Sequence, residues 1–149
     1  MIIVKNLIKR YGKITALNNV SFNFDNEKVF AIMGENGAGK STLLKICTGI
    51  LSYDKGEVYI DGFSINNESI KARENIGYLP EMPEMYNRLS GREFLYYIAS
   101  LRKIKDAEKT IDEITKNIGI YSSLDYEIGS YSKGMKQKIS ITTAIMHNP

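Results

Sequence analysis

Eight consecutive residues have the composition and spacing of a phosphate-binding loop. Residues 34–41 read Gly-Glu-Asn-Gly-Ala-Gly-Lys-Ser and fit the pattern Gly-x-x-x-x-Gly-Lys-Ser/Thr. Glycines permit a concave turn in which successive backbone N–H groups meet phosphate oxygens, so no charged side chain has to be desolvated for each negative charge. The pattern therefore predicts binding of a nucleoside triphosphate.

The polar side chains at the end of this loop have separate predicted roles. Lys40 supplies a positive charge to the β- and γ-phosphates, Ser41 a hydroxyl ligand for magnesium, and Thr42 a hydrogen bond to the α-phosphate. The loop alone does not choose among GTPases, small-molecule kinases and transport ATPases, because all of them carry it. The candidate nucleotide-binding residues of the loop are Gly34, Asn36, Gly37, Ala38, Gly39, Lys40, Ser41 and Thr42.

The elements around the loop are those that the motif requires. Residues 29–33 are apolar at every position, which predicts a strand covered on both faces in a parallel sheet. Residues 41–47 are compatible with a helix, in which we expect Cys47 to be a small buried side chain. Residues 76–79 form a second short strand candidate, which Pro80 ends.

The rest of the chain favours antiparallel strands first and helices later. Residues 20–24 and 57–61 alternate apolar and polar side chains, as half-exposed strands do. Ser90 followed three places later by Glu93 is a capping-box pattern, and Ser132 is a candidate N-cap. Apolar residues recur at helical spacing over residues 94–104, 107–118 and 135–146.

Composition and charge exclude several classes of protein. The 149 residues are 43% hydrophobic and 25% charged, which fits a globular domain and excludes a disordered chain. The longest apolar run is far shorter than the roughly 20 residues of a transmembrane helix, and no signal peptide is expected. One cysteine cannot form an internal disulfide, so we expect a cytoplasmic protein. The net charge of +3 is spread evenly, and no nucleic-acid partner is expected.

Two stretches outside the loop resemble motifs of the ATP-binding subunits of ABC transporters. Tyr11 lies upstream of the loop, where that family keeps an aromatic residue that stacks on adenine. Residues 76–81 resemble the family's Q-loop, but Glu81 stands where glutamine is usual. The resemblance implies that Glu81 approaches magnesium together with Ser41, because a carboxylate oxygen is also a hard ligand. The alternatives are an exposed tyrosine and an ion-paired surface glutamate.

A third stretch, residues 131–138, resembles the family signature Leu-Ser-Gly-Gly-Gln. Ser132 and Gly134 match it, whereas Lys133 and Met135 depart from it. Both these departures and the glutamate in the Q-loop are familiar in the branch of exporters that act on drugs, antibiotics, ions or lipids. The resemblance implies that Ser132, Gly134 and Met135 contact ATP held by a second subunit; an ordinary capped helix is the alternative.

The resemblance covers all 149 residues and implies the fold. We expect an α/β chain with part of a P-loop ATPase core, an N-terminal antiparallel β-subdomain, a helical subdomain and an incomplete sheet. Residues 1–75 would hold the β-subdomain and the loop. Residues 76–149 would hold the Q-loop strand and the helical subdomain with the signature. The whole would be a partial nucleotide-binding domain, stable only when another chain or a rearranged pairing covers residues 29–33.

The resemblance also implies the function and the partners. The chain would bind ATP and magnesium and couple ATP hydrolysis to export. It would pair with a second nucleotide-binding subunit, identical or different, and dock on a transmembrane permease subunit at the cytoplasmic membrane. The alternatives are a non-transport ABC ATPase that acts on ribosomes or DNA, and a non-catalytic ATP-binding fragment.

One element of the family's machinery is missing from the sequence. An apolar strand that ends in Asp-Glu supplies the residue that activates water, and neither residues 58–61 nor residues 111–113 provide it. The family's switch histidine is missing as well, because the single histidine, His147, lies near a helix end. We therefore expect ATP binding with little turnover, since general-base catalysis contributes about 10²- to 10⁴-fold.

Overall fold

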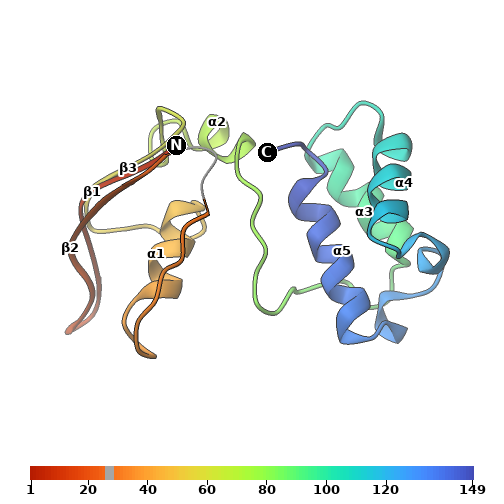
Figure 1. Ribbon diagram of the computed structural model, residues 1–149, viewed down its shortest axis with the longest axis horizontal. Helices are drawn as coiled ribbons and strands as arrows, with labels where there is room; N and C mark the ends of the chain where they lie inside the picture. Colours follow the sequence, from red (N-terminus) through yellow and green to blue (C-terminus); the bar gives the residue numbers. More distant parts are fainter. Residues whose placement is uncertain (26–28) are drawn as a thin grey trace. The chain divides into compact units, whose positions relative to one another are not determined.

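The N-terminal stretches with alternating apolar and polar residues form an antiparallel sheet (Figure 1). The structure is a computed structural model and describes residues 1–25 and 29–149. The sheet has the order β2-β1-β3-β4, and its strands are β1 (Ile2–Tyr11), β2 (Ile14–Phe24), β3 (Lys55–Ile60) and β4 (Phe63–Ser64). The two half-exposed strands that the sequence predicts, around residues 20–24 and 57–61, are confirmed within β2 and β3.

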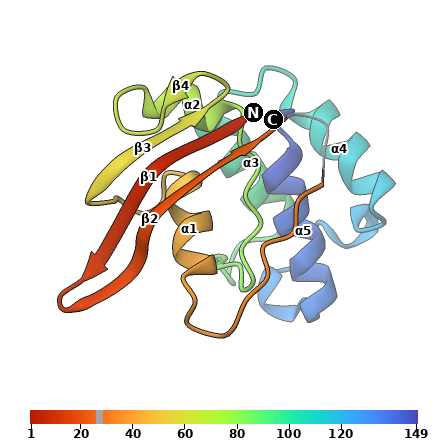
Figure 2. The same ribbon diagram turned by 60° about the vertical axis from the view of Figure 1, so that its left-hand side comes forward.

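Two helices pack against this sheet and close a core with it (Figure 2). Helix α1 (Lys40–Cys47) contacts β2 and β3, and α2 (Ser69–Glu74) contacts β3 and β4. Cys47 ends α1 inside the core, where burial raises the pKa of its thiol to about 11, as expected for a small buried side chain. The sequence does not predict α2, because only Ala72 of its six residues is buried and no apolar period is visible.

The hairpin of β1 and β2 contains an extra residue near its tip. Lys9 pairs with Leu17 and Arg10 pairs with Thr15, so Ala16 is a bulge in β2. Residues that lie opposite each other in an antiparallel pair point to the same side of the sheet. Lys9 therefore shares the side of Leu17, which is buried in the core together with residues of α1.

The apolar run at residues 29–33 is not a strand, and this prediction was wrong. Val29 and Met33 are exposed to 101% and 88%, while Phe30 stacks on Phe24 with ring centroids 4.3 Å apart. Within residues 1–25 and 29–149 no strand is hydrogen-bonded to this run. A parallel strand exists only in a ladder with a neighbour. An apolar sequence supplies the side chains for burial but not that neighbour.

The predicted strand at residues 76–79 was also wrong. The segment has no regular secondary structure, and Gly77 lies against the backbone of the last helix. A Cβ atom on Gly77 would lie 2.4 Å from the carbonyl oxygen of Ala144. The segment therefore packs closely on a helix backbone, whose hydrogen bonds are internal, and within residues 1–25 and 29–149 no strand pairs with it.

The C-terminal half is helical, as predicted. The chain divides into two compact units, Met1–Ile76 and Gly77–Pro149. The second unit consists of α3 (Gly91–Leu101), α4 (Ala107–Asn117), α5 (Lys133–Ile145) and two 3₁₀ turns, η1 (Tyr121–Ser123) and η2 (Ile128–Ser130). The mixed α/β class is confirmed. Among the residues that the structure describes, no helix is long and apolar enough to cross a membrane.

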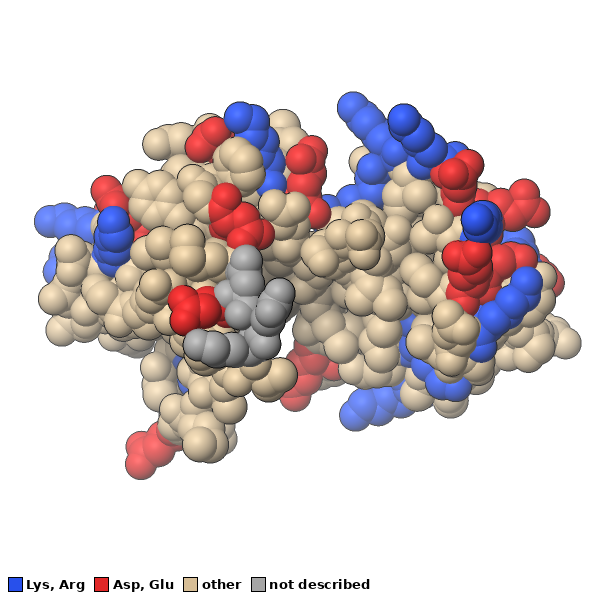
Figure 3. Space-filling view, turned by 45° about the horizontal axis from the view of Figure 1, so that its top comes forward, with Lys and Arg blue, Asp and Glu red and all other residues tan. Residues whose placement is uncertain are grey.

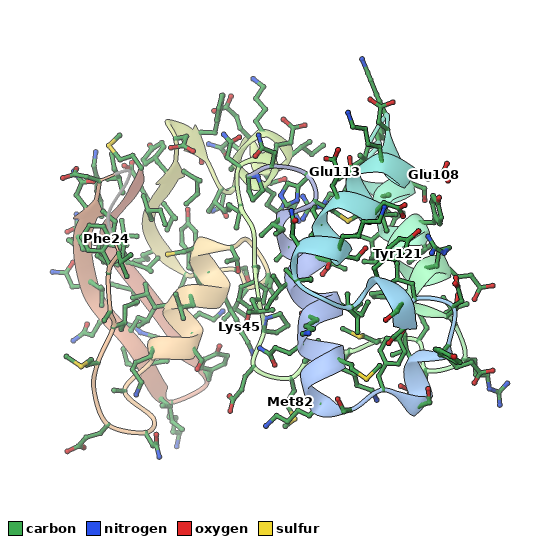
Figure 4. The ribbon with its side chains drawn as sticks, turned by 45° about the vertical axis from the view of Figure 1, so that its right-hand side comes forward. Phe24, Lys45, Met82, Glu108, Glu113 and Tyr121 are labelled. Carbon is green, nitrogen blue, oxygen red and sulfur yellow. The ribbon has the colours of Figure 1, made fainter. Side chains whose placement is uncertain are left out.

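Local signals and side-chain pairs explain why these helices form and pack. Ser90 and Glu93 make the predicted capping box at the start of α3. The guanidinium of Arg92 on α3 donates from Nε to Asp125 at 2.7 Å and lies 5.5 Å from the ring centroid of Tyr121, labelled in Figure 4. Lys116 of α4 lies over the same ring at 4.5 Å, so the ring joins α3 to α4.

Candidate functional site

The phosphate-binding loop leads directly into α1, and the start of this helix has no side-chain cap. Gly39 occupies the N-cap position with φ +87°, and the N–H of Leu43 donates the first helical hydrogen bond, to the Gly39 carbonyl at 2.8 Å. The N–H groups of the first turn have no acceptor within a helix and carry partial positive charge. The amides of Lys40, Ser41 and Thr42 are thus available to an anion.

Lys40 lies across the loop that precedes it. Its Nζ donates to the carbonyl oxygens of Gly34 and Glu35, at 2.7 Å and 2.6 Å. The loop is tightened further by a hydrogen bond of 3.2 Å from the Ala38 N–H to the Glu35 carbonyl. These contacts bring the ammonium group to the same loop whose amides are open, so one cation and several N–H donors can meet a polyphosphate together.

Gly39 joins the loop to the hairpin of β1 and β2. A Cβ atom at this position would lie 2.4 Å from the carbonyl oxygen of Ala16 and 2.9 Å from a methyl carbon of Leu17. Gly37 has a similar φ of +85°, but a Cβ atom there would meet nothing within 4 Å. Gly39 is therefore required both by its backbone conformation and by close approach, whereas Gly37 is required by conformation alone.

Tyr11 lies at the tip of the same hairpin and is 47% exposed. The Nζ of Lys9 lies over its ring, 5.3 Å from the centroid. The structure thus places the candidate base-stacking residue on the hairpin that Gly39 of the phosphate loop contacts. Sequence reasoning missed Lys9. The available signal was its position two residues before Tyr11, since residues i and i+2 of a strand share a face.

The residues around the loop fit a magnesium ion held mainly by phosphate. Mg²⁺ keeps several waters and is commonly bound by one or two protein oxygens together with phosphate oxygens. Ser41 offers one exposed hydroxyl in the first turn of α1. Within residues 1–25 and 29–149, no group of three or more His, Cys, Asp or Glu could hold a metal ion. This donor set suits an ion that arrives with the nucleotide.

Glu81 belongs to the second unit, on the segment between Pro80 and α3. Its side chain is exposed, and it is followed by Met82, which is 82% exposed and labelled in Figure 4. Ser41 belongs to the first unit. The joint approach of Glu81 and Ser41 to one ion therefore stays a prediction.

The signature-like stretch forms the start of α5. Ser132 is the N-cap, and its Oγ accepts a hydrogen bond of 3.2 Å from the Met135 N–H. Gly134 is exposed, and the nearest atom to a Cβ added there would be Ser132 Oγ at 3.9 Å. The side chain of Met135 packs on the core of the second unit. Ser132 and Gly134 thus face solvent at a helix N-terminus, while Met135 contributes mainly to packing.

Tyr131 fixes the backbone immediately before this helix. It is 6% exposed, and its hydroxyl donates to the Ser123 carbonyl at 2.5 Å. A Cβ atom on Gly91 would lie 2.4 Å from the Tyr131 hydroxyl oxygen, so the first residue of α3 has to be glycine for the ring to fit. Burial raises the pKa of Tyr131, which keeps the hydroxyl protonated and able to donate.

An aromatic cavity lies on the second unit beside α3. It has a volume of about 400 Å³. Tyr86 makes edge contacts with Phe94 and Tyr97, at centroid distances of 6.3 Å and 6.1 Å. Tyr86 and Tyr97 are both exposed. The cavity is lined by Glu84, Met85, Tyr86, Phe94, Tyr97 and Ile98.

Comparisons with known proteins agree on one family. A family model described as ABC transporter matches residues 17–149. The chain is 35% identical over 146 residues to the ABC transporter ATP-binding protein YdbJ of Bacillus subtilis (strain 168), covering 98% of this chain and 47% of that protein. It is 33% identical over 149 residues to the lantibiotic transport ATP-binding protein SrtF of Streptococcus pyogenes, covering 100% of this chain and 63% of that protein.

A solved structure has the same fold over the whole of this chain. The dimeric post-hydrolysis state of the ATP-binding cassette MJ0796, bound to ADP and Pi, superposes with a TM-score of 0.87 at 27% identity. The alignment covers 100% of this chain and 71% of that one. The chain spans about half the length of the first curated relatives that it matches.

Proposed function

Since this chain belongs to the ABC transporter family of ATP-binding proteins, we propose that it binds ATP with magnesium as the nucleotide-binding subunit of an exporter. The observation that carries the proposal is the start of α1. An uncapped helix N-terminus, a glycine loop and the Lys40 ammonium group meet there. Each of these features favours a polyphosphate, and together they favour a triphosphate over a singly charged anion.

In the proposed binding mode, each part of the nucleotide has its own contacts. The ring of Tyr11 stacks on the adenine, and the open amides of α1 donate to the phosphates. Lys40 exchanges its carbonyl acceptors for β- and γ-phosphate oxygens, which are better partners for an ammonium group. Ser41 holds magnesium, with Glu81 as a further candidate ligand, and the ion supplies positive charge at the β- and γ-phosphates.

A second nucleotide-binding subunit completes the proposed site. Ser132 and Gly134 at the start of α5 would meet the γ-phosphate of an ATP molecule held by the other chain. Support comes from the exposed helix N-terminus and from the likeness to the dimeric cassette MJ0796. The serine hydroxyl accepts from the Met135 N–H and still has its own proton to donate to a phosphate oxygen.

A membrane subunit is the second proposed partner, and it would dock at the aromatic cavity beside α3. Protein interfaces are enriched in aromatic side chains and are surrounded by a polar rim. Tyr86 and Tyr97 supply such side chains here, and Glu84 supplies a charge at the rim. We propose that, through this docked subunit, ATP hydrolysis drives export of a drug, antibiotic, ion or lipid at the cytoplasmic face of the membrane.

Charge distribution supports transport over action on ribosomes or DNA. On the face drawn in Figure 3, basic and acidic side chains are interspersed. A protein that binds nucleic acid presents a concentrated basic surface. A pull-down that recovers nucleic acid and no membrane protein would favour the alternative.

We further propose that the 149-residue polypeptide by itself hydrolyses ATP slowly. Among residues 1–25 and 29–149, no strand is followed by an Asp-Glu pair; Asp112 and Glu113 lie in α4, where Asp112 pairs with Lys116 at 3.3 Å. Phosphate release measured with added magnesium tests this. A rate comparable to that of intact ATPases contradicts the proposal.

The binding site itself is tested with Lys40→Ala. Loss of the ammonium group should abolish binding of labelled ATP, because the triphosphate loses its only cation in the loop. Lys45→Ala is the matched control, since Lys45 lies on an exposed position of the same helix (Figure 4). Undiminished ATP binding by the Lys40 variant would refute the site assignment.

A further inference from the structure

Lys9 is a charged residue in a buried position. It is 8% exposed, and no other Lys, Arg, Asp or Glu in residues 1–25 and 29–149 is buried. Over the same residues, no carboxylate lies within ion-pair distance of it. Burying a charge is unfavourable unless another group compensates for it. The partner that the structure gives Lys9 is therefore informative about its role.

That partner is the ring of Tyr11. The Lys9 Nζ lies 5.3 Å from the ring centroid, within the range of a cation–π interaction. Such contacts are stronger when the cation is desolvated, as it is here. Tyr11 is 47% exposed, so part of its side chain stays accessible for a further contact while Lys9 lies over the ring.

The pair lies beside the phosphate-binding loop. Lys9 is directly opposite Leu17 in the hairpin, so the two side chains share one side of the sheet. Gly39 approaches the same stretch of β2, because a Cβ atom there would lie 2.9 Å from a methyl carbon of Leu17. Lys9 and Tyr11 thus belong to the hairpin that Gly39 of the loop contacts.

We propose that Lys9 is a positioning residue, which holds the Tyr11 ring in the orientation that stacks on the base of a nucleotide. This inference rests on the proposed function, in which Tyr11 stacks on adenine. A ring that is held before the ligand arrives loses less conformational freedom on binding. Lys9 should therefore strengthen binding of the base and not binding of the phosphates. The two effects can be measured separately.

The test compares two ligands of the 149-residue chain, ATP and inorganic tripolyphosphate. Lys9→Met keeps the packing of the side-chain stem and removes the charge. It should weaken ATP binding about five-fold, the equivalent of one cation–π contact of about 1 kcal/mol. Tripolyphosphate has no base, so its affinity should stay unchanged. Lys9→Arg, which restores a cation over the ring, should return ATP binding to the wild-type value.

The chain contains a matched control in the same sheet. Lys5 Nζ lies 5.7 Å from the ring centroid of Tyr59, in the pairing of β1 with β3. Lys5→Met removes a second lysine–tyrosine contact of β1, in which the lysine is exposed and pairs with β3, not with the stretch of β2 that Gly39 approaches. It should change neither affinity, and thermal melting of all variants reports whether they are folded.

Several outcomes would overturn the inference. Equal loss of ATP and tripolyphosphate binding in Lys9→Met would mean that Lys9 contacts phosphate or supports the fold. No loss of either ligand would mean that it does not act on the site, and failure of Lys9→Arg to restore ATP binding would exclude the cation as the cause. Lys40→Ala separates this inference from the proposed function, because undiminished ATP binding there refutes the site itself.

Discussion

Helices α1 and α5 both begin at a candidate phosphate contact, but they begin in different ways. The first residue before α1 is Gly39, which provides no side-chain cap. The first residue before α5 is Ser132, whose Oγ accepts from the Met135 N–H. The amides at the start of α1 therefore await an external acceptor, whereas one amide of α5 is satisfied within the chain.

The difference suggests two kinds of phosphate contact. Helix α1 lacks the stabilisation that a side-chain cap gives. Its first N–H donors stay open instead, with the charge of Lys40 beside them. At α5 the cap stabilises the helix whether or not a ligand is present, and only the hydroxyl and the exposed Gly134 remain for one. The first arrangement suits a site that holds the nucleotide, and the second suits a surface that meets a nucleotide held elsewhere.

The largest effect on stability and on ATP binding is expected when a methyl group is added at Gly39, the N-cap of α1. In Gly39→Ala the new Cβ atom would collide with the Ala16 carbonyl at 2.4 Å, in a residue whose φ of +87° already disfavours alanine. We expect the free energy of unfolding to fall by about 2–4 kcal/mol and ATP binding to be lost. Urea unfolding and ATP titration measure the two effects.

Gly37→Ala is the control for that variant. Its φ of +85° imposes similar backbone strain, but its Cβ atom would meet nothing within 4 Å. The expected loss of stability is therefore smaller, about 1 kcal/mol. Equal losses in the two variants would show that backbone conformation, and not contact with the hairpin, makes Gly39 necessary.

A medium effect is expected at the start of α5. Ser132→Ala removes the cap and should lower the free energy of unfolding by about 1 kcal/mol. ATP binding to the loop of the same chain should be unchanged, whereas pairing of two chains in the presence of ATP should be lost. Analytical ultracentrifugation with and without ATP measures the pairing.

Ser90→Ala provides the comparison, because Ser90 also caps a helix but lies outside the signature. It should lower stability to a similar extent and leave ATP-dependent pairing as it is. If both variants lose pairing equally, the role of Ser132 is structural only, and the contrast between α1 and α5 disappears.

The smallest effect is a pH dependence of stability that arises at the start of α3. There the side chains of Ser90 and Glu93 each accept from the backbone N–H of the other. The Glu93 carboxylate accepts from the Ser90 N–H at 2.8 Å, and this bond and the Ser90 hydroxyl lower the pKa of Glu93. A lowered pKa adds stability above the unfolded value of about 4.3, and this stability is lost as the pH falls through the folded value. Urea unfolding between pH 6 and pH 3 should show a weaker pH dependence in Glu93→Gln than in the wild type.

The parts of the fold that sequence reasoning predicted are those whose signals are local. Ser90 with Glu93 and Ser132 identify their helix starts because a cap and its amide are three residues apart. The loop at residues 34–41 is likewise contiguous. The strands expected at residues 29–33 and 76–79 failed because a strand depends on a partner that is distant in the chain, which the run itself does not encode.

The candidate site shows the same limit. Lys40 and Ser41 follow from a contiguous motif, whereas Lys9 reads as an ordinary surface lysine in the sequence. Its burial depends on the pairing with Leu17 and on the bulge at Ala16, both of which arise only when β1 and β2 come together. Sequence reasoning therefore predicts the phosphate end of the candidate site and misses Lys9, the proposed support of its base end.

The bulge at Ala16 has a consequence for ligand length. Its carbonyl touches Gly39, which fixes one end of the phosphate loop on the hairpin, and Tyr11 stands at the tip of the same hairpin. The hairpin therefore sets the distance between the proposed contact for the phosphates and the proposed contact for the base. In the proposed binding mode a whole nucleotide reaches both the phosphate loop and the Tyr11 ring. Pyrophosphate has no base, so it reaches only the loop.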